Sequence, residues 1–143
     1  MNTQSKKGAY RIALLIIGFA VTLGACSNSS AQEYKTVSVQ TVDSLRHYDS
    51  SITILDVRTP EEYVSESGHL PKAKLIPVTE LDSRIAELTP DKGKTIVVYC
   101  HSGRRSATAS GMLASKGYHV LNMDGGITAW NSAGLPTEKG ATP

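Results

Sequence analysis

Short runs of apolar, mostly β-branched residues alternate along this chain with segments whose apolar residues recur at helical spacing. The runs predict strands over residues 34–39, 52–57, 74–76, 95–99 and 118–121. The segments between them predict helices through residue 48, from residue 60, over 79–88 and 107–114, and around residue 130. Strands that alternate with helices are typical of a parallel sheet covered on both faces. The pattern therefore predicts a doubly wound α/β sheet flanked by helices in a single domain.

Several helix ends are marked by capping residues. Thr59 can cap a helix that has Pro60 at its first position, and Glu62 can complete a capping box with Thr59. We therefore assign Glu62 to the helix start and give it no catalytic role. Thr79 is the expected cap of the helix over 79–88, and Gly117 suits the position just after the helix over 107–114. Residues 90–93 predict a turn.

The first 25 residues differ from the rest. Residues 1–11 are polar and basic, and residues 12–23 are mostly apolar without any charge. Twelve helical residues span about 18 Å, less than the roughly 30 Å hydrocarbon core of a bilayer, so a secretory signal is favoured over a transmembrane helix. We expect a signal peptide over 1–25, a tether over 26–33, the folded domain over 34–138 and a flexible tail over 139–143.

The end of this leader, Leu23-Gly24-Ala25-Cys26, resembles a bacterial lipobox. The resemblance implies cleavage before Cys26 and attachment of lipid to its thiol; secretion with ordinary cleavage and an uncleaved anchor are the alternatives. Ser27 after the cysteine favours an outer membrane, where the organism has one, over the inner membrane. The expected location is thus the periplasm, with a membrane anchor on Cys26.

Charge and composition exclude several function classes. The formal net charge is +2, but the leader holds three basic residues and no acid, which leaves 12 basic and 13 acidic residues in the remainder. This balance argues against nucleic-acid binding through bulk charge. The histidines at positions 47, 101 and 119 lack the spacing of metal ligands, so we expect no metal and no cofactor. We also expect a monomer.

The candidate chemistry lies where the strand over 95–99 ends. The residues that follow are Cys100-His101-Ser102-Gly103-Arg104-Arg105-Ser106. Ligands of open α/β sheets bind at the carboxyl edge of the strands, and a helix N-terminus there attracts anions. With the positive charge of the two arginines, this field should lower the pKa of the Cys100 thiol and make it a nucleophile. The alternative is a buried structural cysteine at a strand end.

The motif Cys-x-Ser-Gly-x-Arg-Ser resembles the active-site loop of the rhodanese family of sulfurtransferases. The resemblance extends to residues 54–63 and 68–73 before the loop and to residues 123–130 after it. It implies a rhodanese-like fold and a Cys100 persulfide, formed from a donor such as thiosulfate and passed to cyanide or a thiol. It also implies that residues 101–106 bind this small sulfur-containing anion. Six residues from Cys100 to Arg105 match the sulfurtransferases, whereas phosphatase relatives of the same fold have seven.

Roles for Asp56, Arg58 and His69 come from the resemblance, and those considered for His101 come from its place in the loop. Asp56 would organise neighbouring loops and Arg58 could lie at the rim of the site, although a local ion pair or cap explains each equally well. His69 is expected to be a structural hydrogen-bonding residue, and His101 either contacts substrate or faces water. A glycine is usual where Lys72 stands, so we expect a local change in that turn without loss of the fold.

The sequence leaves two functional classes open. In the first, the protein is a rhodanese-type thiosulfate sulfurtransferase that turns over with small molecules. In the second, it is a periplasmic persulfide carrier or sulfur-binding module that serves a protein partner. Because Cys26 is expected to be lipidated, Cys100 is the one thiol left in the domain. A lone thiol suits persulfide transfer better than disulfide exchange, which needs a second cysteine. Thiosulfate and mercaptopyruvate are not distinguished as donors.

Overall fold

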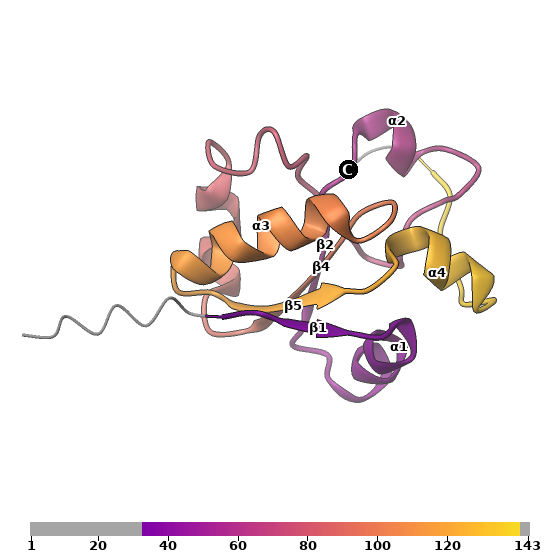
Figure 1. The fold of residues 1–143 in the computed structure, drawn as a ribbon, viewed down its shortest axis with the longest axis horizontal. Coiled ribbons are helices and arrows are strands. Elements are labelled where there is room, and N and C mark those ends of the chain that lie inside the picture. The colour runs from indigo at the N-terminus through magenta and orange to yellow at the C-terminus, as the bar shows by residue number, and fades with distance from the viewer. Residues whose placement is uncertain (1–32, 141–143) are drawn as a thin grey trace, which may run out of the picture.

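A computed structural model describes residues 33–140 of the chain. Its sheet has five strands, all parallel, in the order β1-β5-β4-β2-β3 (Figure 1). The strands are β1 (Lys35–Val37), β2 (Thr53–Asp56), β3 (Lys74–Leu75), β4 (Thr95–Tyr99) and β5 (His119–Met123). The helices are α1 (Val39–Tyr48), α2 (Pro60–Tyr63), α3 (Arg104–Ser115) and α4 (Gly126–Ser132), and the 3-10 helix η1 spans Ile85–Asp91.

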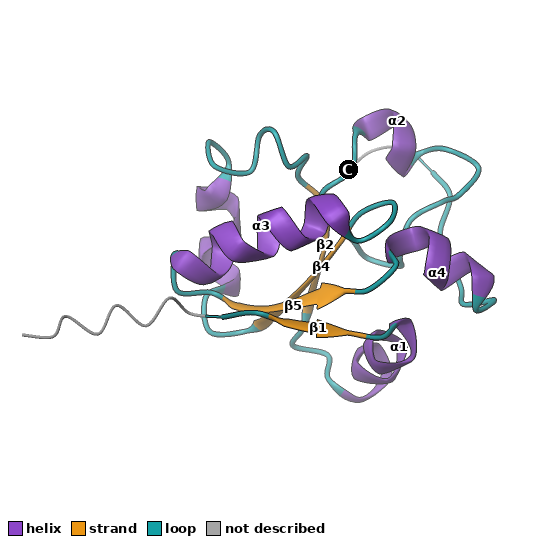
Figure 2. Ribbon diagram, in the orientation of Figure 1, coloured by secondary structure: helices purple, strands orange, loops and turns teal. Residues whose placement is uncertain are grey.

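The helices form layers on the two faces of the sheet (Figure 2). On one face, α1 and α4 pack through residues such as Val42 and Trp130, both fully buried. On the other face, α3 and η1 pack through Leu113 and Leu88, also fully buried. β2 is buried along its whole length, and so is β4 after its first residue. The predicted doubly wound, single-domain architecture is therefore confirmed.

Helix capping follows the sequence prediction at α2 and at the end of α3, whereas Thr79 caps no helix. Ser38 caps α1 by accepting a hydrogen bond from the Thr41 N–H. At α2, the Thr59 hydroxyl accepts from the Glu62 N–H at 3.3 Å, and the Glu62 carboxylate accepts from the Thr59 N–H at 3.0 Å. Gly117 follows the end of α3 with a φ of 84°. Such capping contacts are local, which is why the sequence alone predicts them well.

The predicted helix over 79–88 is wrong. The structure has turns there, followed by η1. This 3-10 helix also includes Pro90 and Asp91, which the sequence predicts to belong to the turn over 90–93. Most backbone hydrogen bonds in this stretch span three residues, as from the Glu87 N–H to the Arg84 carbonyl at 3.0 Å. Pro90 has no N–H to extend an α-helical ladder. Leu81 and Leu88 are nevertheless fully buried, so the apolar pattern predicted their burial and misjudged the backbone.

The loop before β3 contains a left-handed backbone at a lysine. Lys72 has a φ of 61° and is the one non-glycine residue between positions 33 and 140 with a positive φ. This conformation costs about 1 kcal/mol or more for a residue with a Cβ atom. The Lys72 N–H donates to the Glu138 carboxylate at 3.3 Å, so the C-terminal segment helps to hold the turn. The fold tolerates lysine here, as expected.

Candidate active site

Cys100 lies at the carboxyl edge of the sheet, directly after β4, and its side chain is almost fully buried. We call residues 100–105, where the sequence predicts the reactive thiol, the catalytic loop. The Gly103 N–H donates to the Cys100 Sγ at 3.2 Å. Burial raises the pKa of the thiol, but hydrogen bonds from Ser106, Ser102 and Gly103 outweigh it and lower the pKa below its usual value. The loop thus favours the thiolate more than an ordinary cysteine environment does.

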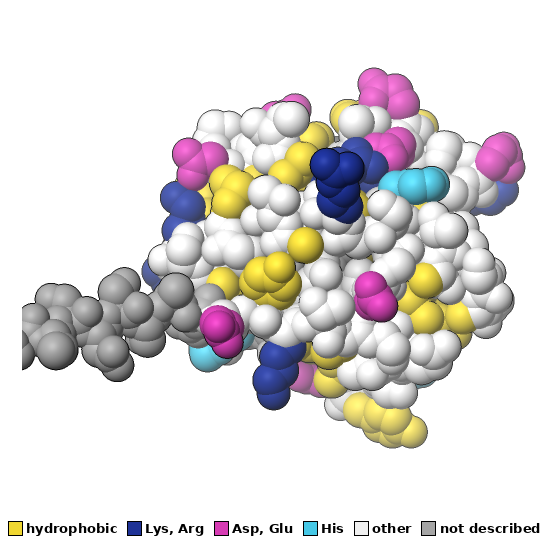
Figure 3. Space-filling model, in the orientation of Figure 1, with side chains coloured by type: hydrophobic (Ala, Val, Ile, Leu, Met, Phe, Trp, Pro, Cys, Tyr) yellow, Lys and Arg dark blue, Asp and Glu magenta, His cyan; other side chains and the backbone are white. Residues whose placement is uncertain are grey.

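The two arginines, the last residues of the catalytic loop, lie in the first turn of α3. Helix α3 begins three residues earlier than the sequence predicts, because Gly103 caps it with a φ of 91° that glycine adopts without strain. The N-terminal N–H groups of α3 therefore face the thiol, and the helix dipole adds partial positive charge. Figure 3 shows a basic side chain and a histidine together over this end of α3, beside the carboxylates of α2.

Glu62 is the main residue that the sequence missed. Its carboxylate accepts from both terminal nitrogens of Arg105, at 2.6 and 2.7 Å, across 43 residues of chain. The hydrogen bonds of Arg105 lower the pKa of Glu62 to about 2. In turn, Glu62 and the Cys100 thiolate raise the pKa of Arg105 against the effect of burial. The capping-box pattern concealed this second role, since one carboxylate serves both the helix start and the arginine.

This ion pair makes folding stability depend on pH, which Glu62→Gln tests. Glutamine can keep the capping bond but loses the charge, so we expect the variant to unfold about 1 kcal/mol more easily at neutral pH. The folded-state pKa of Glu62 lies below its usual value, 4.5, and near 2. The contribution is therefore complete above pH 4.5 and is lost as the pH falls toward 2. Urea unfolding across this range should show the two proteins converging; a constant difference would contradict the assignment.

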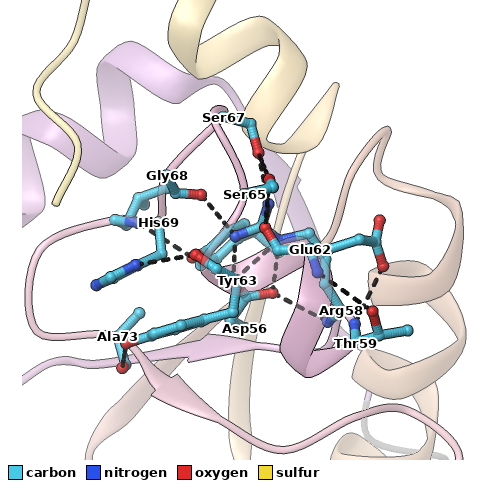
Figure 4. A network of polar contacts seen from close by, with 12 residues as sticks. Asp56, Arg58, Thr59, Glu62, Tyr63, Ser65, Ser67, Gly68, His69 and Ala73 are labelled. Atoms are coloured by element: carbon cyan, nitrogen blue, oxygen red, sulfur yellow. Dashed lines mark hydrogen bonds and ion pairs between the residues drawn. The ribbon is translucent and has the colours of Figure 1, made fainter. Parts of the chain in front are cut away.

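Asp56 and Arg58 form a buried ion pair beneath α2 (Figure 4). Arg58 donates to the Asp56 carboxylate at 2.6–3.0 Å, to the Gly68 carbonyl at 2.8 Å and to the Glu62 carbonyl at 3.1 Å. Burial lowers the pKa of Arg58, but the hydrogen bonds and charge of Asp56 outweigh it and raise the pKa. Arg58 is fully buried, so its suggested place at the rim is wrong. The pair ties α2, and with it Glu62, to the end of β2.

His69 takes a structural position in the same region. Its ring stacks on Tyr63 with centroids 3.7 Å apart, and its Nδ1 lies 3.2 Å from the Tyr63 carbonyl oxygen (Figure 4). The side chain is buried. In contrast, His101 and Ser102 are exposed in the catalytic loop. The His101 Nε2 lies 3.5 Å from the Thr128 hydroxyl. Contact with substrate and exposure to water both stay hypotheses for His101.

Backbone N–H groups at the start of α4 donate hydrogen bonds to the catalytic loop. The Ile127 N–H donates to the Cys100 carbonyl at 2.9 Å, and the Thr128 N–H donates to the His101 carbonyl at 3.1 Å. A Cβ atom at Gly126 would lie 2.3 Å from the Cys100 carbonyl oxygen, so this close approach requires glycine. The sequence did not show which backbone groups of the catalytic loop and α4 meet.

The described part of the chain offers no other obvious reactive centre. Within residues 33–140 no three histidine, cysteine, aspartate or glutamate side chains gather as metal ligands. Over the same residues no helix has the length and apolar character needed to cross a bilayer. The leader, Cys26 and the tether up to residue 32 lie outside the described residues. The chemistry of the described residues therefore centres on the Cys100 thiolate and its cationic surroundings.

Comparison with known proteins decides the family. The family model of the rhodanese-like domain matches residues 38–133 of the sequence, which is more than half of the chain. The chain belongs to the rhodanese family. A rhodanese-like domain protein of Staphylococcus aureus has the same fold, with a TM-score of 0.63 at 29% identity over 73% of this chain and 98% of that one.

Two bacterial relatives of this rhodanese domain carry sulfurtransferase names. Thiosulfate sulfurtransferase PspE of Escherichia coli is 46% identical over 72 residues, which cover 50% of this chain and 67% of that protein. A sulfurtransferase of Allochromatium vinosum is 40% identical over 59% of this chain and 77% of its own. The chain spans only 60% and 42% of the length of two further relatives. The family and fold are thereby established, and the two named relatives point to sulfur transfer.

Proposed function

We propose that this rhodanese domain is a sulfurtransferase that moves sulfane sulfur from a donor such as thiosulfate to cyanide or a thiol through a Cys100 persulfide. The observation that carries the proposal is a buried thiol with a lowered pKa, held by loop N–H groups and faced by Arg105. The names of the two relatives support the same reaction class. A loop of six residues from Cys100 to Arg105, both included, further favours sulfur over a tetrahedral oxyanion.

The reaction needs no proton transfer at sulfur. The Cys100 thiolate attacks the outer sulfur of thiosulfate, the sulfur–sulfur bond of the donor breaks, and sulfite leaves with the bonding electrons. The persulfide then carries its negative charge on the outer sulfur, where loop N–H groups can stabilise it as an oxyanion hole stabilises oxygen. Cyanide attacks that outer sulfur, thiocyanate leaves, and the thiolate of Cys100 returns.

Intact mass and turnover test the proposal together. The purified chain is treated with thiosulfate, weighed by mass spectrometry, and then given cyanide. A mass gain of one sulfur with repeated thiocyanate production supports an enzyme. A gain without repeated turnover favours the alternative, a persulfide carrier that needs a protein acceptor. The absence of both a mass gain and thiocyanate production would contradict sulfur transfer from thiosulfate.

Arg105→Ala tests the electrostatic part of the mechanism. Arg105 faces the thiolate while Glu62 holds it in place, so its loss should raise the pKa of Cys100. We expect about a tenfold loss in kcat/KM for thiosulfate at neutral pH, because the thiolate fraction and the attraction for the dianion both fall. The ultraviolet absorbance of the thiolate, followed against pH, measures the first effect. An unchanged titration and unchanged thiosulfate kinetics would refute this role.

We also propose a periplasmic location with a lipid on Cys26, supported by the lipobox-like sequence Leu23-Gly24-Ala25-Cys26. Cells that express the full chain are expected to incorporate a labelled fatty acid into the protein, because diacylation of this cysteine adds fatty acyl chains. The Cys26→Ser chain should carry no label. Equal labelling of both chains, or of neither, would contradict the lipid anchor.

A further inference from the structure

A cavity of 440 Å³ opens at the amino edge of the sheet, at the opposite end of the strands from Cys100. It lies between the C-terminal end of α1, the start of β2 and the loop that leads into β3. Thr53, the first residue of β2, and Lys94, which directly precedes β4, both line it. A five-residue strand such as β4 separates the two edges by about 16 Å. The cavity is thus a separate place from the catalytic loop, and its size is typical of small-molecule sites.

The lining of this cavity is predominantly cationic. Its charged members are Arg46, Lys72, Lys74, Lys94, Asp49 and Asp91. Four positive charges therefore face two negative ones, although the domain as a whole has a slight excess of acids. The Asp49 carboxylate accepts from the Ser51 N–H at 2.8 Å and from the Ser51 hydroxyl, which lowers its pKa and keeps its negative charge in the lining. Arg46 is paired with Asp43 at 3.1 Å, so an anion would meet mainly the charges of the three lysines, of which Lys74 and Lys94 share one carboxylate.

Asp91 organises two of the lysines without satisfying them. Its side chain is almost fully buried, and its carboxylate pairs with the ammonium groups of both Lys74 and Lys94. Each ammonium has three N–H donors, and about half of each lysine side chain stays exposed. One buried carboxylate thus holds two lysines in place while each keeps donors for a further acceptor.

Lys72 adds a charge to this cavity at a cost to the backbone. Its left-handed φ of 61° is one that glycine adopts without strain. Between residues 33 and 140 no carboxylate forms an ion pair with its ammonium group. Strain kept at a charged residue that lines a cavity indicates that the side chain has a use there.

The remaining lining makes the site amphipathic. Ile52, Ile54 and Pro71 contribute apolar surface next to the lysines. We propose that this cavity binds a small organic anion that joins a phosphate-type dianion to a short apolar group. The dianion would pair with Lys72, Lys74 and Lys94, and the apolar group would lie against the isoleucines. Tight binding needs both parts of the ligand, because the anion alone would contact only the lysines and the apolar group alone would contact only the apolar lining.

Phenyl phosphate is a suitable probe, with inorganic phosphate and phenol as controls for its two halves. Amide resonances of the isotope-labelled, purified chain are followed by NMR during titration. We expect saturable shifts at residues that line the cavity, with phenyl phosphate binding at least about fivefold more tightly than phosphate and phenol causing no saturable change. Shifts confined to the catalytic loop, or none, would overturn the proposal.

Lys72→Gly separates binding from folding. Glycine relieves the backbone strain, so the variant should melt at the same temperature as the wild-type chain or higher, while its affinity for phenyl phosphate falls about fivefold or more. The matched control is Lys116→Gln, which removes an exposed lysine outside the cavity and should leave binding unchanged. Unchanged affinity in Lys72→Gly, or an equal loss in Lys116→Gln, would also overturn the proposal.

Discussion

The Cys100→Ser chain is expected to lose at least about 10³-fold in thiosulfate:cyanide sulfur transfer, and it should gain no sulfur on treatment with thiosulfate. A serine hydroxyl stays protonated at neutral pH, so the field that stabilises the thiolate cannot make it a comparable nucleophile. The loop should survive the exchange, because its main supports are backbone bonds such as the one from the Ile127 N–H to the Cys100 carbonyl. Thiocyanate formation and intact mass are the measurements.

Circular dichroism and melting temperature serve as the control for folding in this experiment. The matched variant is Cys26→Ser, which removes the other cysteine of the chain and should keep full transfer after purification. Residual turnover in Cys100→Ser above about one hundredth of the wild-type rate would rule out the persulfide mechanism. Loss of transfer in Cys26→Ser alone would place the reactive thiol outside the described domain.

Gly126→Ala should damage both stability and activity. The added Cβ atom would lie 2.3 Å from the Cys100 carbonyl oxygen and 2.6 Å from the His101 carbonyl oxygen, and both are backbone atoms that cannot rotate away. The start of α4 must then separate from the catalytic loop, which breaks the bonds that Ile127 and Thr128 donate. We expect a loss of about 2–4 kcal/mol in the free energy of unfolding and a fall of at least about tenfold in kcat.

Gly134→Ala separates the close contact from simple backbone strain. Gly134 also has a positive φ, 68°, but a Cβ atom there would meet nothing within 4 Å. This variant should lose only about 1 kcal/mol and keep its kcat. Urea unfolding and thiosulfate kinetics on both proteins give the comparison. Equal effects in the two variants would mean that the contact between α4 and the loop is unimportant.

The sequence predicted those features that depend on neighbouring residues. The strands, the capping box at Thr59 and the position of Cys100 at the end of β4 all follow from local patterns. The helix predicted over 79–88 failed because apolar spacing fits several backbones when the segment only has to bury Leu81 and Leu88. Helix α3 was placed too late because the sequence did not show Gly103 acting as a left-handed cap.

Features that join distant residues were beyond the sequence alone. The pair between Glu62 and Arg105 spans 43 positions, and no spacing rule connects a helix start to a loop so far away. The same holds for the contact between Gly126 and the Cys100 carbonyl. Arg58 could be read as a rim residue or as an ion-pair partner, and only the packing of the loop around Gly68 decided for the buried pair.

The parallel arrangement of β1 and β4 in one sheet determines how the protein can be presented on a surface. The described chain enters β1 at Lys35, on the amino edge, whereas Cys100 follows β4 on the carboxyl edge. A bead or sensor chip attached ahead of Lys35 would therefore leave the edge of the sheet that holds the catalytic loop facing away from the support. Attachment through Lys139 or Gly140 would differ, because that segment pairs with His69 in the loop that follows α2.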